Sequence, residues 1–550
     1  MTDTFDVVVI GSGAGGGAAA WALAERGVSV LLLEAGPAYD PFSDYRLDRP
    51  DWETQHFPAK VPTKGRQTAA PMQKLEEKWR DLQSWNRVKG LYNTGERRGN
   101  WGYSHVVGLG GSTLHFTGEA HRMHPDAMRM RSRFGVAADW PMDYAELEPF
   151  YLEAERLVGV AGPSNDPTRP RSAPYPLPAH PLCYGSQQVE KGCQKLGLSF
   201  IANARAALSQ PYDNRPACNY CGNCTRGCPR TDKGSVDVTF IPKAAATGHC
   251  TIRTEATVLR LEAGPADHVS GVEYINAAGA KHNVKARAIV VACGAVETPR
   301  LLLASDVGNE SGQVGRHFME TLSWASSGLH DDPLGSHRGL PSDGVCWDFN
   351  APDAIPGIVG GCRFSPVVHE ADLTGPLTYA TRVVGGWGRA HKTAMRERFG
   401  RALSVGAIGE SLPNPGSYID LDPEVRDKNG IAKARIHSHL DDTELKRLAF
   451  MAKTTREILK ASGAGDIFEE YGAYDGFQPT HVFGTCRMGT DPAESVVDPF
   501  GRSHRWRNLI VADASVFPSS GGGESPALTI EALAIRSARH LADRAKRGDL

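Results

Sequence analysis

Short apolar runs separated by glycines dominate the first part of the chain. Residues 5–10 (FDVVVI) form a run typical of a buried strand. An Ala-rich stretch then predicts a helix that reaches about residue 26 and ends at Gly27, and residues 28–34 (VSVLLLE) predict a second strand. The order strand, helix, strand predicts a βαβ unit and therefore an α/β fold.

A glycine-rich turn joins the first predicted strand to the helix. Gly11 makes the tight turn, Gly13 lets a pyrophosphate approach the backbone, and Gly16 lets the helix pack closely on the strand. Ser12 lies within this turn, and Glu34 ends the second strand, where a carboxylate can bind a ribose diol. The motif predicts a dinucleotide site without separating FAD from NAD.

Periodicity in the rest of the chain predicts a second type of sheet. Residues 288–294 (AIVVACG) fit a buried strand of a parallel sheet, and alternating residues 250–279 fit a small antiparallel meander. Residues 417–423 and 432–440 predict antiparallel strands, and residues 442–463 predict an amphipathic helix that starts at an Asp cap. The fold class expected is α/β with an additional α+β part.

The composition is that of an ordinary globular protein. The 550 residues are 41% hydrophobic and carry a formal net charge of -2, so nucleic acid is not expected as a partner. The length predicts two or three domains. No secretory signal and no apolar stretch of 18 residues is visible, so we expect no integral membrane segment. A cytoplasmic location is the default expectation, and periplasmic export together with a signal-bearing partner stays open.

Four of the 11 cysteines lie close together in the sequence. Cys218, Cys221, Cys224 and Cys228 have the spacing of a bacterial ferredoxin segment, and Pro229 follows them. Three alternatives are open: an iron–sulfur cluster held by three or four thiolates, a structural zinc site, and a packed or disulfide-linked loop. The cluster is the favoured hypothesis, either 4Fe-4S or 3Fe-4S.

Four stretches in a fixed order resemble one enzyme family. Residues 105–118, 288–305, 480–498 and 508–538 together resemble the glucose–methanol–choline (GMC) flavoprotein oxidoreductases, in particular those sugar and alcohol dehydrogenases that contain a cysteine cluster. The resemblance implies FAD as the cofactor, in a discontinuous Rossmann-like domain beside an α+β substrate domain with an antiparallel sheet. The implied FAD-binding domain comprises residues 1–36, 99–159, 239–319 and 477–550; residues 37–98 form a lid or insertion, residues 160–238 the Pro-rich and cysteine insertion, and residues 320–476 the substrate domain.

The resemblance also implies the catalytic residues. His481 matches the family histidine at the flavin face, and an unperturbed imidazole suits proton transfer near neutral pH. The second catalytic position, normally Asn or His, is Ser525 here, or Glu524 after a shift of one residue. Serine is short, so we expect His481 to act alone as the base while Ser525 positions the hydroxyl.

Further residues are expected near the FAD by the same resemblance. His115 follows a Gly-Gly-Ser turn and is either covalently joined to the flavin, as in some members of the family, or only close to it. Asp513 is expected near the ribityl or pyrophosphate part, with a cap or turn role as the alternative. The cofactor-binding positions implied in this way are Gly110, Gly111, Ser112, His115, Val258, Gly294, Asp513 and Pro526.

The expected function is a dehydrogenase that oxidises an alcohol or sugar hydroxyl to a carbonyl. The cysteines favour a dehydrogenase over an oxidase, because one-electron transfer through a cluster is needed only for an acceptor such as a cytochrome, a quinone or a partner protein. An electron-transfer or small accessory subunit is therefore an expected partner. The alternatives are an O₂-using oxidase with a structural cysteine loop and an FAD-containing lyase. His437, His439 and Glu410 are polar candidates in the substrate domain, and ordinary strand or loop roles explain them equally well.

Overall fold

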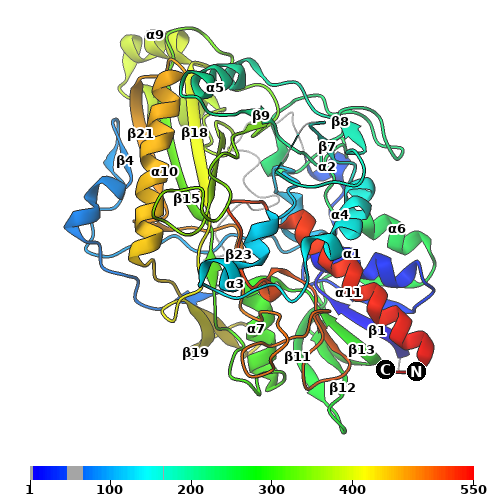
Figure 1. Cartoon of the computed structure of the whole chain (residues 1–550). Helices are drawn as coiled ribbons and strands as arrows, with labels where there is room; N and C mark the ends of the chain where they lie inside the picture. Colours follow the sequence, from blue (N-terminus) through cyan, green and yellow to red (C-terminus); the bar gives the residue numbers. More distant parts are fainter. Residues whose placement is uncertain (1–3, 46–65, 165, 167, 550) are drawn as a thin grey trace.

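Two large sheets form the framework of the molecule (Figure 1). The structure is a computed structural model and describes residues 4–45, 66–164, 166 and 168–549. The expected lid of residues 37–98 lies partly outside the described residues, because residues 46–65 are not among them. The helices of the described residues are α1 (Ala14–Ala24), α2 (Pro41–Asp44), α3 (Met130–Phe134), α4 (Tyr144–Val158), α5 (Tyr184–Lys195), α6 (Phe240–Ala246), α7 (Gly294–Ser305), α8 (Pro376–Tyr379), α9 (Gly388–Arg398), α10 (Asp442–Ala461) and α11 (Ala527–Arg547).

The first sheet contains the N-terminal βαβ unit and has seven strands. Its order is β10-β2-β1-β13-β12-β11, with β24 also paired to β13. The neighbours of β1 are both parallel to it, with Val8 opposite Leu31 on one side and Ile289 on the other. The strands are β1 (Thr4–Ile10), β2 (Val30–Leu33), β10 (Cys250–Arg253), β11 (Thr257–Ala263), β12 (Val269–Ile275), β13 (Lys281–Val291) and β24 (Leu509–Val511).

Helices cover this sheet and bury its apolar strands. Every residue of β2 is buried, and every residue of α1 after Ala14 is buried. α1 packs against α11 and α6, and α11 also packs against α4 (Figure 1). The all-round burial explains why residues 14–24 are Ala- and Gly-rich, since only small side chains let three neighbours approach one helix.

The second sheet is antiparallel and forms the core of the other part of the molecule. Its order is β17-β18-β15-β21-β4-β5. α10 packs on β15 and β18, and α5 packs on α10 (Figure 1). The strands are β4 (Trp85–Asn86), β5 (Gly90–Leu91), β15 (Leu322–Leu329), β17 (Cys362–Pro366), β18 (Ala402–Gly409) and β21 (Asp466–Gly472).

Short pairings connect the two parts. β14 (Met319–Glu320) pairs with β23 (Val482–Phe483), and the N–H of Thr321 donates to the carbonyl oxygen of His481 at 3.1 Å. The remaining small sheets are β3 (Thr68–Ala69) with β19 (Tyr418–Arg426) and β20 (Ala432–His437), β6 (Gly99–Asn100) with β22 (Gly476–Phe477), β7 (Ala161–Gly162) with β8 (Leu177–Pro178), and β9 (Ile201–Ala202) with β16 (Gly344–Val345).

The α/β fold class, the predicted strands and the helix at residues 442–463 are confirmed. α10 begins after Asp441, whose side chain forms a capping box with Glu444. The meander differs in one strand, because β10 joins the first sheet parallel to β2 instead of pairing with β11. Residues 85–91, within the expected lid or insertion of residues 37–98, form the edge of the second sheet. Among the described residues, no helix has both the length and the apolar character of a membrane span.

Candidate active site

The glycine turn after β1 is shaped by close backbone contacts. A Cβ at Gly16 would lie 1.8 Å from the carbonyl oxygen of Gly11, and one at Gly15 would lie 1.7 Å from that of Ala512. Gly11 has φ +90° and abuts the carbonyl of Ala292. The turn therefore tolerates no side chain at these positions, and its packing partners come from two strands that lie far along the sequence.

Ser12 joins this turn to a second glycine turn almost 100 residues away. Its Oγ donates to Glu34 Oε2 at 2.6 Å and accepts from the N–H of Gly110 at 3.0 Å. Glu34 Oε1 accepts from the N–H of Gly36 at 2.8 Å. Burial raises the pKa of Glu34, and these hydrogen bonds oppose the rise. The sequence pointed to Glu34, and the structure places its carboxylate directly beside the turn.

The two glycine turns form one cradle that fits a pyrophosphate. Gly111 has φ +56°, and a Cβ there would lie 2.8 Å from the Cα of Gly13. Gly13 is the N-cap of α1 and provides no side-chain cap, and the first turn of α1 has no acidic residue. An uncapped helix N-terminus of this kind binds phosphate through its free N–H groups. Ser112 follows Gly111 in this cradle, and a hydrogen bond from the N–H of Val106 to its Oγ at 3.2 Å holds its side chain in place.

The other expected cofactor residues have structural partners of their own. Asp513 accepts from the N–H of Gly294 at 2.9 Å, from Thr298 and from the N–H of Ser515, so it caps both α7 and the short turn at residues 514–516. The cap role is thus present, and contact with FAD stays a prediction. Val258 lies in β11 against the core, and Pro526 is the N-cap of α11.

His481 lies where the two parts of the molecule meet. It immediately precedes β23, is half-buried, and has an imidazole with no hydrogen-bond partner among the described side chains. Burial lowers the pKa of His481 to about 4; the nearby Glu119 raises it and Arg363 lowers it further. The imidazole is therefore neutral near pH 7 and can accept a proton.

Ser525 belongs to a buried polar cluster around Glu119. Its Oγ donates to Glu119 Oε2 at 2.8 Å, and its N–H donates to His121 Nδ1 at 3.0 Å. Arg363 donates to the same carboxylate at 2.7 Å, and Asn203 donates to it at 2.9 Å. Glu119 thus holds Ser525 by a hydrogen bond and acts on His481 through its charge.

Glu524 points into a different set of contacts from Ser525. Its Oε1 accepts from Arg169 at 2.9 Å, from Asn350 at 3.1 Å and from the N–H of His124 at 3.0 Å. The guanidinium of Arg169 also lies 3.9 Å from the ring centre of Trp347. Glu524 is therefore the ion-pair partner of Arg169, and the structure gives Ser525 the position closer to the Glu119 cluster.

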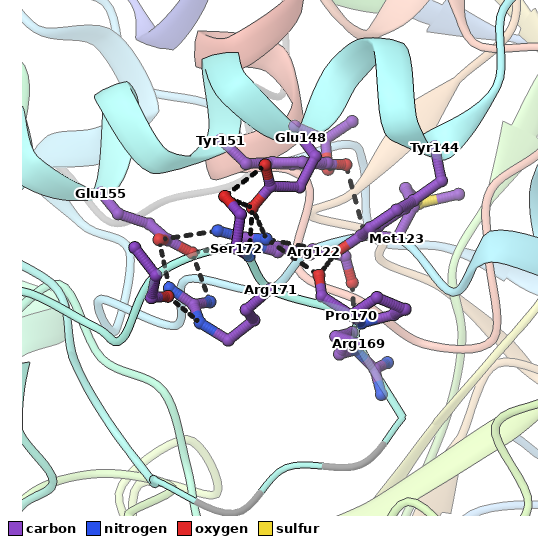
Figure 2. A network of polar contacts seen from close by, with 12 residues as sticks. Arg122, Met123, Tyr144, Glu148, Tyr151, Glu155, Arg169, Pro170, Arg171 and Ser172 are labelled. Carbon is purple, nitrogen blue, oxygen red and sulfur yellow. Dashed lines mark hydrogen bonds and ion pairs between the residues drawn. The ribbon is translucent and has the colours of Figure 1, made fainter.

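A network on α4 fixes the loop that carries Arg169 (Figure 2). Arg122 donates to both oxygens of Glu155, at 2.8 and 3.0 Å, and to Glu148 at 3.1 Å. Arg171 donates to the same Glu155 at 2.6 and 2.9 Å. Arg169 in turn donates to the carbonyl of Arg122 at 3.1 Å. The network thereby anchors the Pro-rich segment near the candidate active site.

The cysteine loop is attached to the segment that contains His115. The imidazole of His115 donates to the carbonyl of Thr225. The buried ammonium of Lys233 donates to the carbonyls of Leu114 at 2.8 Å, Phe116 at 3.1 Å and Cys224 at 2.8 Å. His115 thus lies between the expected flavin region and the cysteines, and its covalent link to flavin stays a prediction.

The four cysteines differ in exposure, and all 11 cysteines of the chain are free thiols. Cys224 is buried, Cys218 and Cys228 are half-buried, and Cys221 is exposed. Burial raises the pKa of Cys218, Cys224 and Cys228. Within the part of the chain that the structure describes, no three His, Cys, Asp or Glu side chains are placed to hold one metal ion. Because the thiols are free, this loop contains no disulfide. Because no three ligating side chains converge among the described residues, the geometry of the loop is not that of a single-ion zinc site.

The polar candidates of the substrate domain have ordinary partners. The ring of His437 stacks on Tyr418 with centres 3.8 Å apart and contacts Asp420 at 3.2 Å. The carbonyl of His439 accepts from Ser417 at 3.1 Å. Glu410 is buried at the end of β18, and burial raises its pKa to about 7.

Sequence reasoning missed several residues of the site. Glu119 and His121 follow the motif of residues 105–118, and an acidic residue and a histidine next to a glycine-rich turn were an available signal. Lys233 lies five residues after Cys228, where a single lysine carries no pattern. Arg363 lies in a strand whose alternation is not distinctive, so only the fold could place it beside Glu119.

The comparisons with known proteins agree with this geometry. The family models for GMC oxidoreductase match residues 127–322 and 413–534, and an NAD(P)-binding Rossmann-like model matches residues 9–39. The fructose dehydrogenase large subunit of Gluconobacter japonicus is 30% identical over 99% of this chain and 98% of its own length. The paromamine 6'-oxidase of Streptomyces fradiae is 30% identical over 98% of this chain and 91% of its own length.

A solved structure shares the fold. The formate oxidase of Aspergillus oryzae matches with a TM-score of 0.64 at 16% identity, covering 100% of this chain and 99% of that chain. The glycine cradle fits the FAD that this family uses, and the half-buried His481 matches the family motif. From the two matching family models and a full-length relative with 30% identity, it follows that this chain belongs to the GMC oxidoreductase family.

Proposed function

We propose that this FAD-dependent oxidoreductase is a dehydrogenase that oxidises the hydroxyl of an alcohol or a sugar to a carbonyl. The observation that carries the proposal is the state of His481. Its imidazole is neutral, half-buried and without a hydrogen-bond partner among the described side chains, and it senses the charge of Glu119, the carboxylate that holds Ser525. A base that is neither protonated nor engaged is what the removal of a hydroxyl proton requires.

Each residue has a defined task in this proposal. FAD, when bound, accepts the hydride from the carbon that carries the hydroxyl. His481 accepts the hydroxyl proton, and Ser525 contacts the substrate beside it. The cradle of Gly11, Gly13 and Gly111 holds the pyrophosphate of the cofactor.

The test is anaerobic flavin reduction by substrate in His481→Asn. We expect the rate to fall by about 10²- to 10⁴-fold, the usual contribution of a general base, with FAD content unchanged. His282→Asn is the matched control, because His282 is exposed on β13. A near-normal reduction rate in His481→Asn would remove this residue from the reaction.

We further propose that Cys218, Cys221, Cys224 and Cys228 hold an iron–sulfur cluster that passes electrons one at a time to a partner protein. The support is their ferredoxin-like spacing and the attachment of their loop to residues 114–116 through Lys233 and His115. Because burial raises the pKa of Cys218, Cys224 and Cys228, loading would release protons from these three thiols. The relative named as a large subunit supports an assembly with further subunits.

This second proposal is tested on anaerobically purified protein. Iron and acid-labile sulfide are measured per FAD, with EPR before and after reduction. Stoichiometric iron and sulfide with a cluster signal support it. Flavin without either, in protein handled so that a cluster would survive, contradicts it.

An O₂-using oxidase is the second candidate function. It is favoured by the arrangement of the cysteines, because among the described residues no three metal-ligating side chains converge on one ion. A relative of equal identity is also named as an oxidase. Hydrogen peroxide formed in step with the oxidised substrate would decide for this candidate, and its absence with an active artificial acceptor would decide for the dehydrogenase.

A further inference from the structure

Ser525 has a single proton to donate, and the structure shows where that proton points. Its Oγ lies 2.8 Å from Glu119 Oε2. Burial by itself would raise the pKa of Glu119, but Arg363 holds that pKa well below its usual range. Glu119 is therefore an ionised carboxylate and can only accept a hydrogen bond. The hydroxyl of Ser525 must be the donor, and only its lone pairs remain for a substrate.

The hydrogen-bond donors next to Ser525 also donate to partners within the protein. His121 Nδ1 accepts from the N–H of Ser525, so its proton is on Nε2, which faces Asn203 Oδ1 at 2.8 Å. The amide nitrogen of Asn203 donates to Glu119 and, at 2.9 Å, to the carbonyl of Ser342. Arg363 donates to the carbonyl of Gly523 at 2.6 Å as well as to Glu119. The cluster thus leaves Ser525 Oγ able only to accept a hydrogen bond from a substrate.

An acceptor at this position has a chemical consequence. The substrate hydroxyl that is oxidised has one proton, and that proton goes to His481. Ser525 therefore has nothing to donate to the oxygen of this hydroxyl and nothing to receive from it. A second donor of the substrate, placed on the neighbouring carbon, can instead donate to Ser525 Oγ.

We propose that Ser525, held by Glu119, is a specificity residue that selects substrates with a vicinal diol, one hydroxyl being oxidised while its neighbour donates to Ser525 Oγ. The inference rests on the proposed function. In the reaction the C–H bond of the first carbon breaks and its electron pair leaves as hydride to FAD, while the O–H proton passes to His481 and the C=O bond forms. The second hydroxyl is unchanged, so no further reactant is needed. Glu119 is a positioning residue, because it acts through Ser525.

The experiment measures anaerobic flavin reduction by matched pairs that differ in one hydroxyl. The probes are 1,2-propanediol with 1-propanol, trans-1,2-cyclohexanediol with cyclohexanol, and glucose with 2-deoxyglucose. For wild-type protein we expect kcat/KM for the diol to exceed kcat/KM for its partner that lacks one hydroxyl by about tenfold, the size of one net hydrogen bond. In Ser525→Ala we expect this ratio to fall to about one.

Ser525→Asn is the second variant, because an amide can donate to the oxidised oxygen. We expect the amide to raise kcat/KM for the mono-alcohol and thereby to reduce the ratio. Ser519→Ala is the control within the same loop, since the Ser519 hydroxyl donates to the carbonyl of Ala127 and not to Glu119. In Ser519→Ala the ratio should stay at the wild-type value.

The two proposals fail in different ways. Reduction of the flavin by diol and mono-alcohol at equal rates in wild-type protein, or a diol preference that survives in both Ser525 variants, overturns the inference and leaves the proposed function intact. Flavin that no probe reduces in any of the three pairs overturns both.

Discussion

At the scale of single residues, the site depends on burial more than on residue type. His481 was predicted from its motif, but the motif does not say that its imidazole is neutral and unengaged. That property comes from the surrounding protein, which lowers the pKa of His481 to about 4. Glu119 shows the opposite case, because a residue with no motif of its own fixes Ser525 and affects His481.

The lowered pKa of His481 makes a prediction about pH. A base must be neutral to act, so the rate constant for flavin reduction should be constant from about pH 5 to 8 and should fall as the pH drops through about 4. The measurement is anaerobic stopped-flow after a rapid pH jump, with tryptophan fluorescence to verify that the protein stays folded. A limb near 6.5, the ordinary value for histidine, would contradict the lowered pKa of His481.

At the scale of elements, regular periodicity was sufficient to predict a helix or a strand where one face of that element is buried. α10 has an acidic cap and an amphipathic pattern, and its bounds were predicted closely. The strand β10 was assigned to the wrong neighbours, because its alternating pattern fits an antiparallel meander and a sheet edge equally well. Residues 85–91 form strands of two residues each, which are too short for any pattern to predict.

The attachment of the cysteine loop predicts a local effect of Lys233. In Lys233→Met, three carbonyls lose their donor, so we expect a free energy of unfolding lower by about 2–4 kcal/mol and faster labelling of Cys224 by a thiol reagent. Denaturant unfolding and mass spectrometry of labelled peptides measure the two effects.

Lys243→Met is the control for Lys233→Met. Lys243 pairs with Asp213 while both side chains are about one-third exposed, so its loss should change stability by less than about 1 kcal/mol. Unchanged labelling of Cys224 in Lys233→Met would show that the loop is held by other contacts.

At the scale of the whole molecule, the first sheet is assembled from distant parts of the chain. Its central strand β1 lies between β2 and β13, and β13 also pairs with β24 near the C-terminus. The discontinuous arrangement came from the family resemblance, since nothing in the local pattern of residues 4–10 specifies a partner 280 residues away. The packing of α11 on α1 and α4 likewise joins segments that lie far apart in the sequence.

This assembly predicts that the C-terminal helix is indispensable. A chain that stops after residue 526 lacks α11 and exposes the face of α1 that α11 covers, so we expect insoluble protein without FAD. A chain that stops after residue 547 keeps α11 and should retain solubility and FAD content. Soluble, yellow protein from the shorter chain would show that the sheet is stable without α11.

The order of the strands also has a consequence for synthesis. Ribosomes add about 5–20 residues per second, so β1 waits roughly 15–55 s for β13 to emerge, and longer for β24. During that time an apolar strand edge is exposed, which is the situation in which chaperones bind nascent chains. The FAD cradle is completed by Gly111, Ala292 and Ala512, so it cannot form before the ribosome has made all three segments. Cofactor capture is therefore expected to follow synthesis of residue 512, and flavin supply affects how much of the assembled chain matures.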